Sequence, residues 1–546
     1  MKAPGGTKVS ESRPALIAAI PVPANSGLSA QDKRWLVLGV VVLIVGIALR
    51  LQLATASQTP GHGDSAFYYT VAKNIVDGRG LVVDYVVYFF AGLVPITHYA
   101  GDFWNPLAEI LLSLPMMLLG KSVFNALLAT IAAGIVPAVV AYFAARRFAG
   151  SVPAAVMAGM LTFFAPYQVW MSTRTEAIIF FGAFGSLAVL FAIKGRSRGR
   201  MFLIAALCTG LTHLVRQDGV LLLLALLASI LLAPIPFRSR LALCIGAGVI
   251  HTVVISPLLI RNYAMFHSLM PPGPSSTMFL TTYEDFHAYG KTLDWQTLRA
   301  TWGIRGLIIR RLHTAAENLG QIEYFLDPVL LILTSLGIVS LVRRRKQLDL
   351  WFFLPVGLFS LFEYLFYSFI ASFSGPGTLP KALAIVIPFA CIAIVELLRF
   401  YIHPRMLLAA AVFVLAAYGA YKGYQSNYVS ALYYNRAYAD YRTVESMVLD
   451  DAARSGTPKD QVVIMARDVW DVYEATGLKA VMIPNNDMAT ILLVARHYNV
   501  GYMLLPAPRK ALDDIYMGTT PDAHFSFLGR VPHTDLVVFK LNLGAK

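Results

Sequence analysis

Charged residues are scarce in this sequence. Asp, Glu, Lys and Arg make up only 14% of its 546 residues, whereas hydrophobic residues make up 57%. An ordinary soluble domain carries about 25% charged residues, so a soluble protein of this length is excluded. Apolar stretches of about twenty residues recur along the chain, and that is the length a membrane-spanning helix requires. The sequence therefore predicts an all-α polytopic membrane protein.

Cysteine is also rare. The three cysteines, Cys208, Cys244 and Cys391, all lie inside apolar stretches. They are interpreted as small buried hydrophobic residues, which excludes a disulfide framework and a cysteine-based metal site. Acidic residues are outnumbered, which leaves a formal net charge of +14. Because Lys and Arg cluster in short loops, this excess follows the positive-inside rule and does not indicate binding of nucleic acid.

The apolar stretches and the basic loops together predict the topology. Residues 1–32 are rich in Pro, Ala and Ser and are interpreted as a disordered cytoplasmic tail. Eleven spans are predicted, at residues 35–53, 122–145, 152–169, 176–193, 201–215, 220–235, 241–260, 325–341, 348–370, 380–398 and 406–421. Residues 106–120 are apolar but short and contain Pro115, so they predict an interfacial or re-entrant helix.

This count divides the chain into a transmembrane domain, residues 33–426, and a C-terminal domain, residues 427–546. The transmembrane domain carries two large outer loops, residues 54–121 and 264–324. The C-terminal domain shows alternating helix and strand patterns, so it is expected to be a small α/β domain outside the cytoplasm. It contains no Walker loop and no glycine-rich dinucleotide fingerprint.

One polar stretch in the first outer loop, residues 61–78, stands out. Phe67, Val71 and Ile75 recur at helical spacing, which predicts an amphipathic helix in the membrane interface. Asp64 falls in its first turn. An aspartate there can be the N-cap of the helix or an acid with a catalytic role, and the stretch alone leaves both interpretations open.

Other ionisable residues gather at the same membrane face. They are Asp84, His98, Asp102, Arg174, Glu176, Arg216, Asp218, Arg261, Glu363 and Lys381. Each has an ordinary explanation, such as a cation at a helix end or a local ion pair. Together they indicate a site with an acid and several cations. Such a site can deprotonate an acceptor and stabilise a departing phosphate.

Several motifs occur in an order that resembles the GT-C superfamily of integral membrane glycosyltransferases. They are Gly-Asp-Ser-Ala-Phe-Tyr-Tyr from Gly63, Asp-Phe-Trp-Asn-Pro-Leu from Asp102, Val-Ala-Tyr-Phe-Ala-Ala-Arg-Arg-Phe-Ala-Gly from Val140, Thr175-Glu176, Leu-Val-Arg-Gln-Asp-Gly from Leu214, and Arg261-Asn262-Tyr263. This superfamily includes protein O-mannosyltransferases, aminoarabinose transferases and oligosaccharyltransferase catalytic subunits. The resemblance covers residues 35–421.

The resemblance implies roles for particular residues. In the family an acidic residue of the first outer loop is the catalytic base, and this maps onto Asp64. The usual Asp-Glu pair is Asp64-Ser65 here, so Asp102 is the candidate for the second acid. The candidates for the donor phosphate are Arg261, Lys381 and Arg216, and the other site candidates are Tyr68, His98, Glu176 and Glu363. No metal ligands are assigned and no cofactor is certain, although a divalent cation stays open because some branches use one.

The function implied is a glycosyltransferase that uses a polyprenyl-phosphate sugar at the outer face of the plasma membrane. Its acceptor would be a lipid, a glycan or a protein. The alternative is a transporter or flippase of lipid-linked sugars. A transporter often shows two matching halves with helices broken at the midplane. The sequence has no matching halves, which favours the enzyme.

Overall fold

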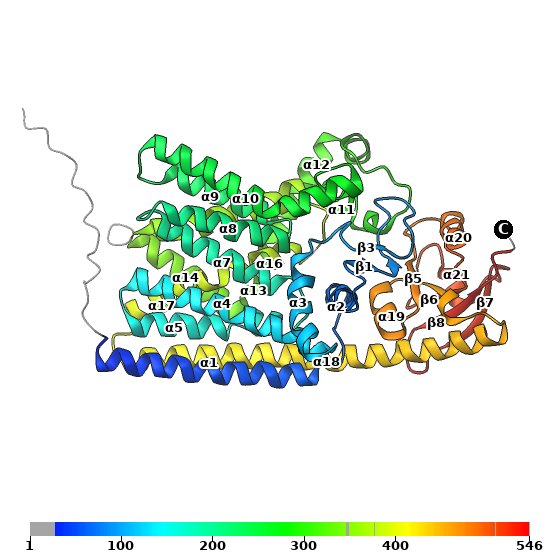
Figure 1. The fold of residues 1–546 in the computed structure, drawn as a ribbon, viewed down its shortest axis with the longest axis horizontal. Coiled ribbons are helices and arrows are strands. Elements are labelled where there is room, and N and C mark those ends of the chain that lie inside the picture. The colour runs from blue at the N-terminus through cyan, green and yellow to red at the C-terminus, as the bar shows by residue number, and fades with distance from the viewer. Residues whose placement is uncertain (1–27, 345–348, 376, 508, 545–546) are drawn as a thin grey trace, which may run out of the picture.

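The computed structural model describes residues 28–344, 349–375, 377–507 and 509–544. Most of the expected N-terminal tail, residues 1–32, lies outside the described residues. A bundle of helices forms one end of the molecule, and a mixed domain of strands and helices forms the other (Figure 1). The first outer loop, with α2 (Gly63–Val76), lies between these two parts.

Within the described residues, seven helical segments are long and apolar enough to cross a membrane. They are α1 (Ala30–Ala56), α4 (Val123–Ala149), α7 (Ile178–Gly195), α10 (Phe237–Phe266), Trp351–Ile370, Thr378–Tyr401 and α18 (Arg405–Arg454). An eighth results if Trp295–Leu326 and α14 (Pro328–Arg343), bent by 107° relative to each other, count as one span. These helices confirm a polytopic membrane protein.

Each of the eleven predicted spans overlaps a helix, and seven or eight of these segments are long and apolar enough to cross a membrane. Three of these helices are shorter than the others: α5 (Val152–Phe163), α8 (Arg200–Val215) and α9 (Gly219–Leu232). α5 is extended by α6 (Pro166–Met171) after a break at Phe164 and Ala165. The interfacial helix expected at residues 106–120 is α3 (Leu107–Leu119), which exposes Leu118 and Leu119.

The longest described helix, α18, joins two elements that the sequence predicted separately. The span at residues 406–421 and a separate helix in the C-terminal domain were expected, but one helix of 50 residues covers both. The boundary expected at residue 427 therefore falls within a helix. At the rise of an α-helix α18 is about 75 Å long, and it runs along the bundle into the C-terminal domain (Figure 1).

The C-terminal domain is built on a six-stranded sheet in the order β2-β5-β4-β6-β8-β7. The strands are β2 (Tyr85–Val86), β4 (Val463–Ala466), β5 (Lys479–Met482), β6 (Tyr502–Leu505), β7 (Phe525–Arg530) and β8 (Val537–Leu541). The first four of these pair in parallel, whereas β8 and β7 are antiparallel. β2 belongs to the first outer loop, so the sheet is shared between two distant parts of the chain. The helices α19 (Val469–Thr476), α20 (Met488–His497) and α21 (Asp513–Met517) complete the domain.

The sequence predicted that α2 has a side facing the membrane interface, but α2 is buried within the protein. Ten of its 14 residues are buried, on all sides of the helix. It packs between α3 and α19. Thr70 Oγ1 and Lys73 Nζ bind Glu474 of α19 at 2.8 and 2.7 Å. The apolar spacing that predicted a membrane-facing side is explained by this packing inside the protein.

The second outer loop, residues 264–324, also reaches the C-terminal domain. It contains α11 (Pro272–Thr277), η1 (Tyr283–His287) and α12 (Trp295–Gly320), which is kinked at Gly303. The backbone N–H of Asn485 donates to His287 O at 3.0 Å, and the Asn486 side chain binds both the N–H and the carbonyl of Tyr289. Both outer loops are therefore held against the C-terminal domain.

Candidate active site

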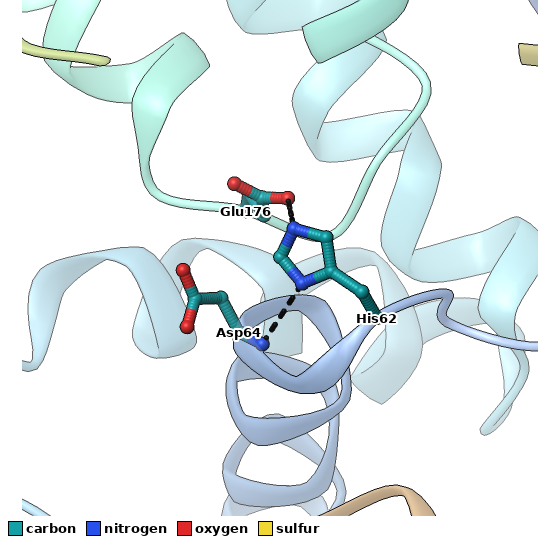
Figure 2. A group of neighbouring side chains, drawn as sticks. All are labelled: His62, Asp64 and Glu176. Atoms are coloured by element: carbon teal, nitrogen blue, oxygen red, sulfur yellow. Dashed lines mark hydrogen bonds and ion pairs between the residues drawn. The ribbon is translucent and has the colours of Figure 1, made fainter. Parts of the chain in front are cut away.

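The first turn of α2 is arranged by a histidine. His62 is the N-cap residue, and its Nδ1 accepts a hydrogen bond from the backbone N–H of Asp64 at 3.1 Å. Because Nδ1 accepts, the hydrogen of a neutral ring lies on Nε2, which donates to Glu176 Oε1 at 2.9 Å (Figure 2). The carboxylate of Asp64 is thus not the helix cap, and the interpretation of Asp64 as an N-cap is wrong.

A lysine from the transmembrane domain completes this cluster. Lys381 lies in α16 (Thr378–Ala382), and its Nζ is 2.6 Å from Asp64 Oδ2 and 3.8 Å from Glu176 Oε2. The side chains of Asp64 and Lys381 are 34% and 27% exposed, whereas that of Glu176 is only 2% exposed. Asp64 is therefore the carboxylate that a substrate can reach.

Glu176 is held from several sides in the turn between α6 and α7. Besides His62 and Lys381, it is contacted by Ser65 Oγ at 3.2 Å and by Arg174 Nη1 at 3.4 Å. Burial acts to raise the pKa of Glu176, but His62, Lys381 and Arg174 outweigh it and hold the pKa well below its usual range. Glu176 is a buried, ionised anchor for the cluster.

Asp64 has the same balance of effects. Its removal from water acts to raise its pKa, as does the nearby charge of Glu176, but Lys381, through its charge and its hydrogen bond, together with His62 brings the pKa below its usual value. Asp64 is therefore a carboxylate at neutral pH. An ionised and reachable acid is what a general base requires.

The same residues offer ligands that suit a divalent cation. One ligand atom from each of His62, Asp64 and Glu176 lies within 4.8 Å of the others (Figure 2), and imidazole with carboxylates is a common ligand set. The ammonium of Lys381 already lies against both carboxylates. The chain therefore places a cation of its own where a metal ion would otherwise balance their charge.

Arg216 belongs to a neighbouring group in the turn between α8 and α9. Its Nε and Nη2 donate to Asp218 Oδ2 at 3.1 and 2.6 Å. Tyr68 is buried in α2. Burial raises the pKa of its hydroxyl, and the charges of Asp64 and Glu176 act in the same direction while that of Arg216 opposes them. Glu363 is fully buried in α15 (Leu354–Leu365), and neither of its oxygens has a hydrogen-bond partner among the described residues.

Asp102, His98 and Arg261 form a separate group. Arg261 Nη1 donates to Gly101 O at 2.9 Å, and its guanidinium lies 4.7 Å from the centre of the Tyr99 ring. Burial raises the pKa of Asp102, while His98 and Arg261 act in the opposite direction. The structure thus places Asp102 with Arg261, and the acid beside Asp64 is Glu176. Nε and Nη2 of Arg261 are buried and have no partner in the part of the chain that the structure describes.

A cavity of about 230 Å³ lies between α12, η3 (Phe366–Ile370) and α16. Its lining combines apolar surface with polar groups of Tyr283, Arg310, Asn318, Gln321, Tyr367 and Thr378. Thr378 lies in α16, one helical turn before Lys381. The cavity therefore shares α16 with Lys381 and can hold a polar group of a substrate.

Two residues of this site were missed by the sequence reasoning. His62 is two positions before Asp64, but histidine is not among the preferred N-cap residues, and nothing local pairs it with Glu176. Tyr283 lies in a long outer loop without a clear pattern. Its position depends on contacts between η1 and the C-terminal domain, which a single sequence does not display.

Comparison with known proteins places these features in context. The profile of the dolichyl-phosphate-mannose-protein mannosyltransferase family matches residues 105–260. The crystal structure of ArnT from Cupriavidus metallidurans bound to undecaprenyl phosphate matches with a TM-score of 0.59 and 15% identity, over 94% of this chain and 99% of that one. The structure of the same protein in the apo state matches with a TM-score of 0.55, 14% identity, and 95% and 100% coverage.

The oligosaccharyltransferase from Archaeoglobus fulgidus in the apo form also matches, with a TM-score of 0.55 and 12% identity, over 86% of this chain and 69% of that one. No curated protein sequence matches the chain. At these identities the structural likeness shows the fold. The protein is a multi-pass membrane protein with the fold of the GT-C superfamily of membrane glycosyltransferases, and the resemblance found in the sequence motifs is confirmed.

Proposed function

We propose that the protein transfers a sugar from a polyprenyl-phosphate donor to an acceptor at the outer face of the plasma membrane, with Asp64 as the general base. The observation that carries this proposal is the ion pair of Asp64 and Lys381. It combines a reachable carboxylate with a cation from α16, the helix that also lines the cavity. The ArnT structure bound to undecaprenyl phosphate supports a polyprenyl phosphate as the lipid part of the donor.

The reaction follows from the charges of this pair. An acceptor hydroxyl attacks the anomeric carbon of the sugar while Asp64 takes the proton of the hydroxyl. The bond between that carbon and the phosphate oxygen breaks, and the polyprenyl phosphate leaves with the electron pair. Lys381 moves from Asp64 toward the phosphate and stabilises its negative charge. This shift also makes Asp64 more basic at the moment when it must accept the proton.

The other cations have different capacities to bind the donor. Arg216 is occupied by Asp218, so we assign it to positioning. Arg261 has two N–H groups without partners among the described residues, and a phosphate accepts such a pair with bidentate geometry. We therefore place a second contact to the donor phosphate at Arg261. The cation for the leaving phosphate is Lys381.

The test uses the purified full-length protein in lipid nanodiscs with a panel of polyprenyl-phosphate sugars. Release of polyprenyl phosphate and of sugar is measured for the wild type, Asp64→Asn and Asp77→Asn. Asp77 lies at the other end of α2, where it contacts Lys121, so it is a matched control. We expect Asp64→Asn to lose at least about a hundredfold in rate, with Asp77→Asn close to the wild type. Full activity in the Asp64→Asn variant would exclude Asp64 as the base.

The alternative of a transporter or flippase is not favoured, because the matching family and structures are glycosyltransferases. The two functions differ in their products. A flippase moves the intact lipid-linked sugar across a proteoliposome membrane, whereas a transferase breaks the bond between sugar and phosphate. Movement of the intact donor without release of polyprenyl phosphate would therefore contradict the proposed function.

A further inference from the structure

The parallel part of the C-terminal sheet has a point at which the strand order reverses. β4 lies between β5 and β6, and the chain visits β4, then β5 on one side, then β6 on the other. In open α/β sheets, ligands bind beyond the carboxyl ends of the strands at such a point. Arg467 follows β4 directly, and Arg509 comes shortly after β6. Both arginines thus lie at the position where a ligand is expected.

Arg467 is exposed and Arg509 is half-buried, and neither has a charged partner among the described residues. In the described ranges, neither guanidinium forms an ion pair or a side-chain hydrogen bond, and Nη1 of Arg509 is buried without a partner. β4 and β6 are paired parallel strands, so the segments that follow their carboxyl ends, with Arg467 and Arg509, start side by side. Burial lowers the pKa of Arg509 and the charge of Arg467 lowers it further, while the charges of Glu284 and Asp468 act in the opposite direction. The two positive charges are therefore not balanced by ion pairs within the described residues.

A histidine of the second outer loop borders the arginines without adding charge. His287 O accepts a hydrogen bond from the backbone N–H of Asn485, which follows β5, and the ring of His287 stacks on that of Tyr88 at 5.6 Å and 10°. Burial lowers the pKa of His287 to about 4, and the charges of Arg509 and Arg467 contribute to this effect. The ring is therefore neutral at neutral pH. Its one N–H is engaged by the backbone of Val87, so the donors for a ligand come from the arginines.

This group is next to the candidate active site. α19 begins directly after Arg467 and Asp468, and a side chain at Gly63 would overlap the indole of Trp470 in its first turn. The first turn of α19 is thus in contact with the residue before Asp64. Burial raises the pKa of Tyr283, and the charge of Asp64 acts in the same direction.

We propose that Arg467 and Arg509 form a subsite for an oxyanion, a carboxylate or a phosphate, on the acceptor. This inference rests on the proposed function. The subsite belongs to the C-terminal domain, and Arg467 is exposed. The lipid part of the donor must stay with the membrane helices, whereas an acceptor held by this domain can reach Asp64. The acceptor is thus a molecule with an acidic group at some distance from its reacting hydroxyl.

The test compares Arg467→Gln and Arg509→Gln with Arg496→Gln, an exposed arginine on α20 of the same domain. The full-length protein is held in nanodiscs of zwitterionic lipid, and binding of inorganic pyrophosphate and of glucuronate is measured by calorimetry. Each of the two subsite variants is expected to weaken binding of at least one probe by about tenfold to a hundredfold. The Arg496→Gln variant is expected to bind as the wild type does.

The two probes and a lipid arm separate the sources of the oxyanion. Preference for glucuronate indicates an acidic sugar, and preference for pyrophosphate indicates a phosphate. Phosphatidic acid in the nanodisc competes with the soluble probe only if a lipid headgroup reaches the subsite. Wild-type protein that binds neither probe, or subsite variants with unchanged affinity for both, would overturn the inference.

Donor hydrolysis without any acceptor is measured in parallel for each variant. Water replaces the acceptor in this reaction, so the rate depends on the donor and the Asp64 cluster but not on the oxyanion subsite. Normal hydrolysis in the two subsite variants shows that they are folded. Absence of hydrolysis in the wild type, with every donor in the panel, would count against the proposed function, while the binding data would still decide on the subsite.

Discussion

The neighbouring carboxylates of Asp64 and Glu176 have different roles because different residues surround them. Glu176 is closed off by His62, Arg174 and Ser65, and it is almost fully buried. Asp64 has one direct charged partner, Lys381, and is partly exposed. A proton acceptor must have a lone pair that can reach the substrate, so Asp64 fits this role and Glu176 serves to position it.

The protonation of Asp64 gives a prediction at this scale. The pKa of Asp64 lies below its usual value of 3.8, so Asp64 stays ionised at any pH above this value. The rate of the wild type should therefore stay constant as the pH falls toward about 4 and decline only at lower pH. In Lys381→Gln the lowering charge is removed and burial remains, so the acid limb of kcat/KM should move to higher pH. Lys121→Gln, which removes a surface partner of Asp77, is the control. Identical acid limbs in all three proteins would contradict this explanation.

His62 gives a second prediction. Its Nδ1 caps α2, and its Nε2 binds Glu176. His62→Ala removes both bonds and should cost about 1 kcal/mol for the cap alone. His62→Asn can restore the cap but not the bond to Glu176, so its thermal unfolding temperature should lie between those of the wild type and the Ala variant. Equal unfolding temperatures for the three proteins would show that the cap contributes nothing.

At the scale of elements, the contact between α2 and α19 determines where Asp64 lies. The chain passes so close to Trp470 at Gly63 that a Cβ there has no room. Gly63→Ala should separate the two helices and cost about 1–3 kcal/mol through overpacking, with a loss of transfer activity because Asp64 is the next residue. The double variant with Trp470→Leu should recover stability.

Gly248→Ala is the control for this experiment. Gly248 lies in α10, and nothing is within 4 Å of a Cβ added to it. Alanine is the better helix former, so this variant should keep or gain stability. Similar losses in the Gly63→Ala and Gly248→Ala variants would mean that the effect is not due to Trp470.

The membrane helices could be predicted from the sequence because length and hydrophobicity of a span are local properties. The continuity of α18 could not be predicted. Lys422, Gln425 and Asn427 end the apolar stretch, but a helical backbone does not require apolar side chains and continues beyond them. The burial of α2 was also missed, since a helix packed between protein elements has the same apolar spacing as one at a membrane surface. Asp64, Glu176 and Lys381 were found as acids and cations at one face, but their pairing requires the fold.

At the scale of the whole molecule, the first outer loop, which carries Asp64, adds a strand of only two residues to the sheet of the C-terminal domain. β2 adds to the edge of the sheet beside β5, and such a short strand leaves no periodic signal in the sequence. Tyr473 of α19 also donates to Asp84, next to β2, at 2.8 Å. The first outer loop and the C-terminal domain must therefore lie on the same side of the membrane, together with Asp64.

This arrangement gives a prediction about topology. The basic loops indicate that the C-terminal domain is outside the cytoplasm. A phosphatase that is active only outside should be active when fused after Lys546, and a fluorescent protein that folds only in the cytoplasm should be dark there. Fusions after Arg200, at the basic start of α8, should give the opposite result and serve as the control. A bright fluorescent fusion after Lys546 would place the C-terminal domain in the cytoplasm. Because this domain shares its sheet with the first outer loop, Asp64 and the proposed transfer reaction would then have to be there as well.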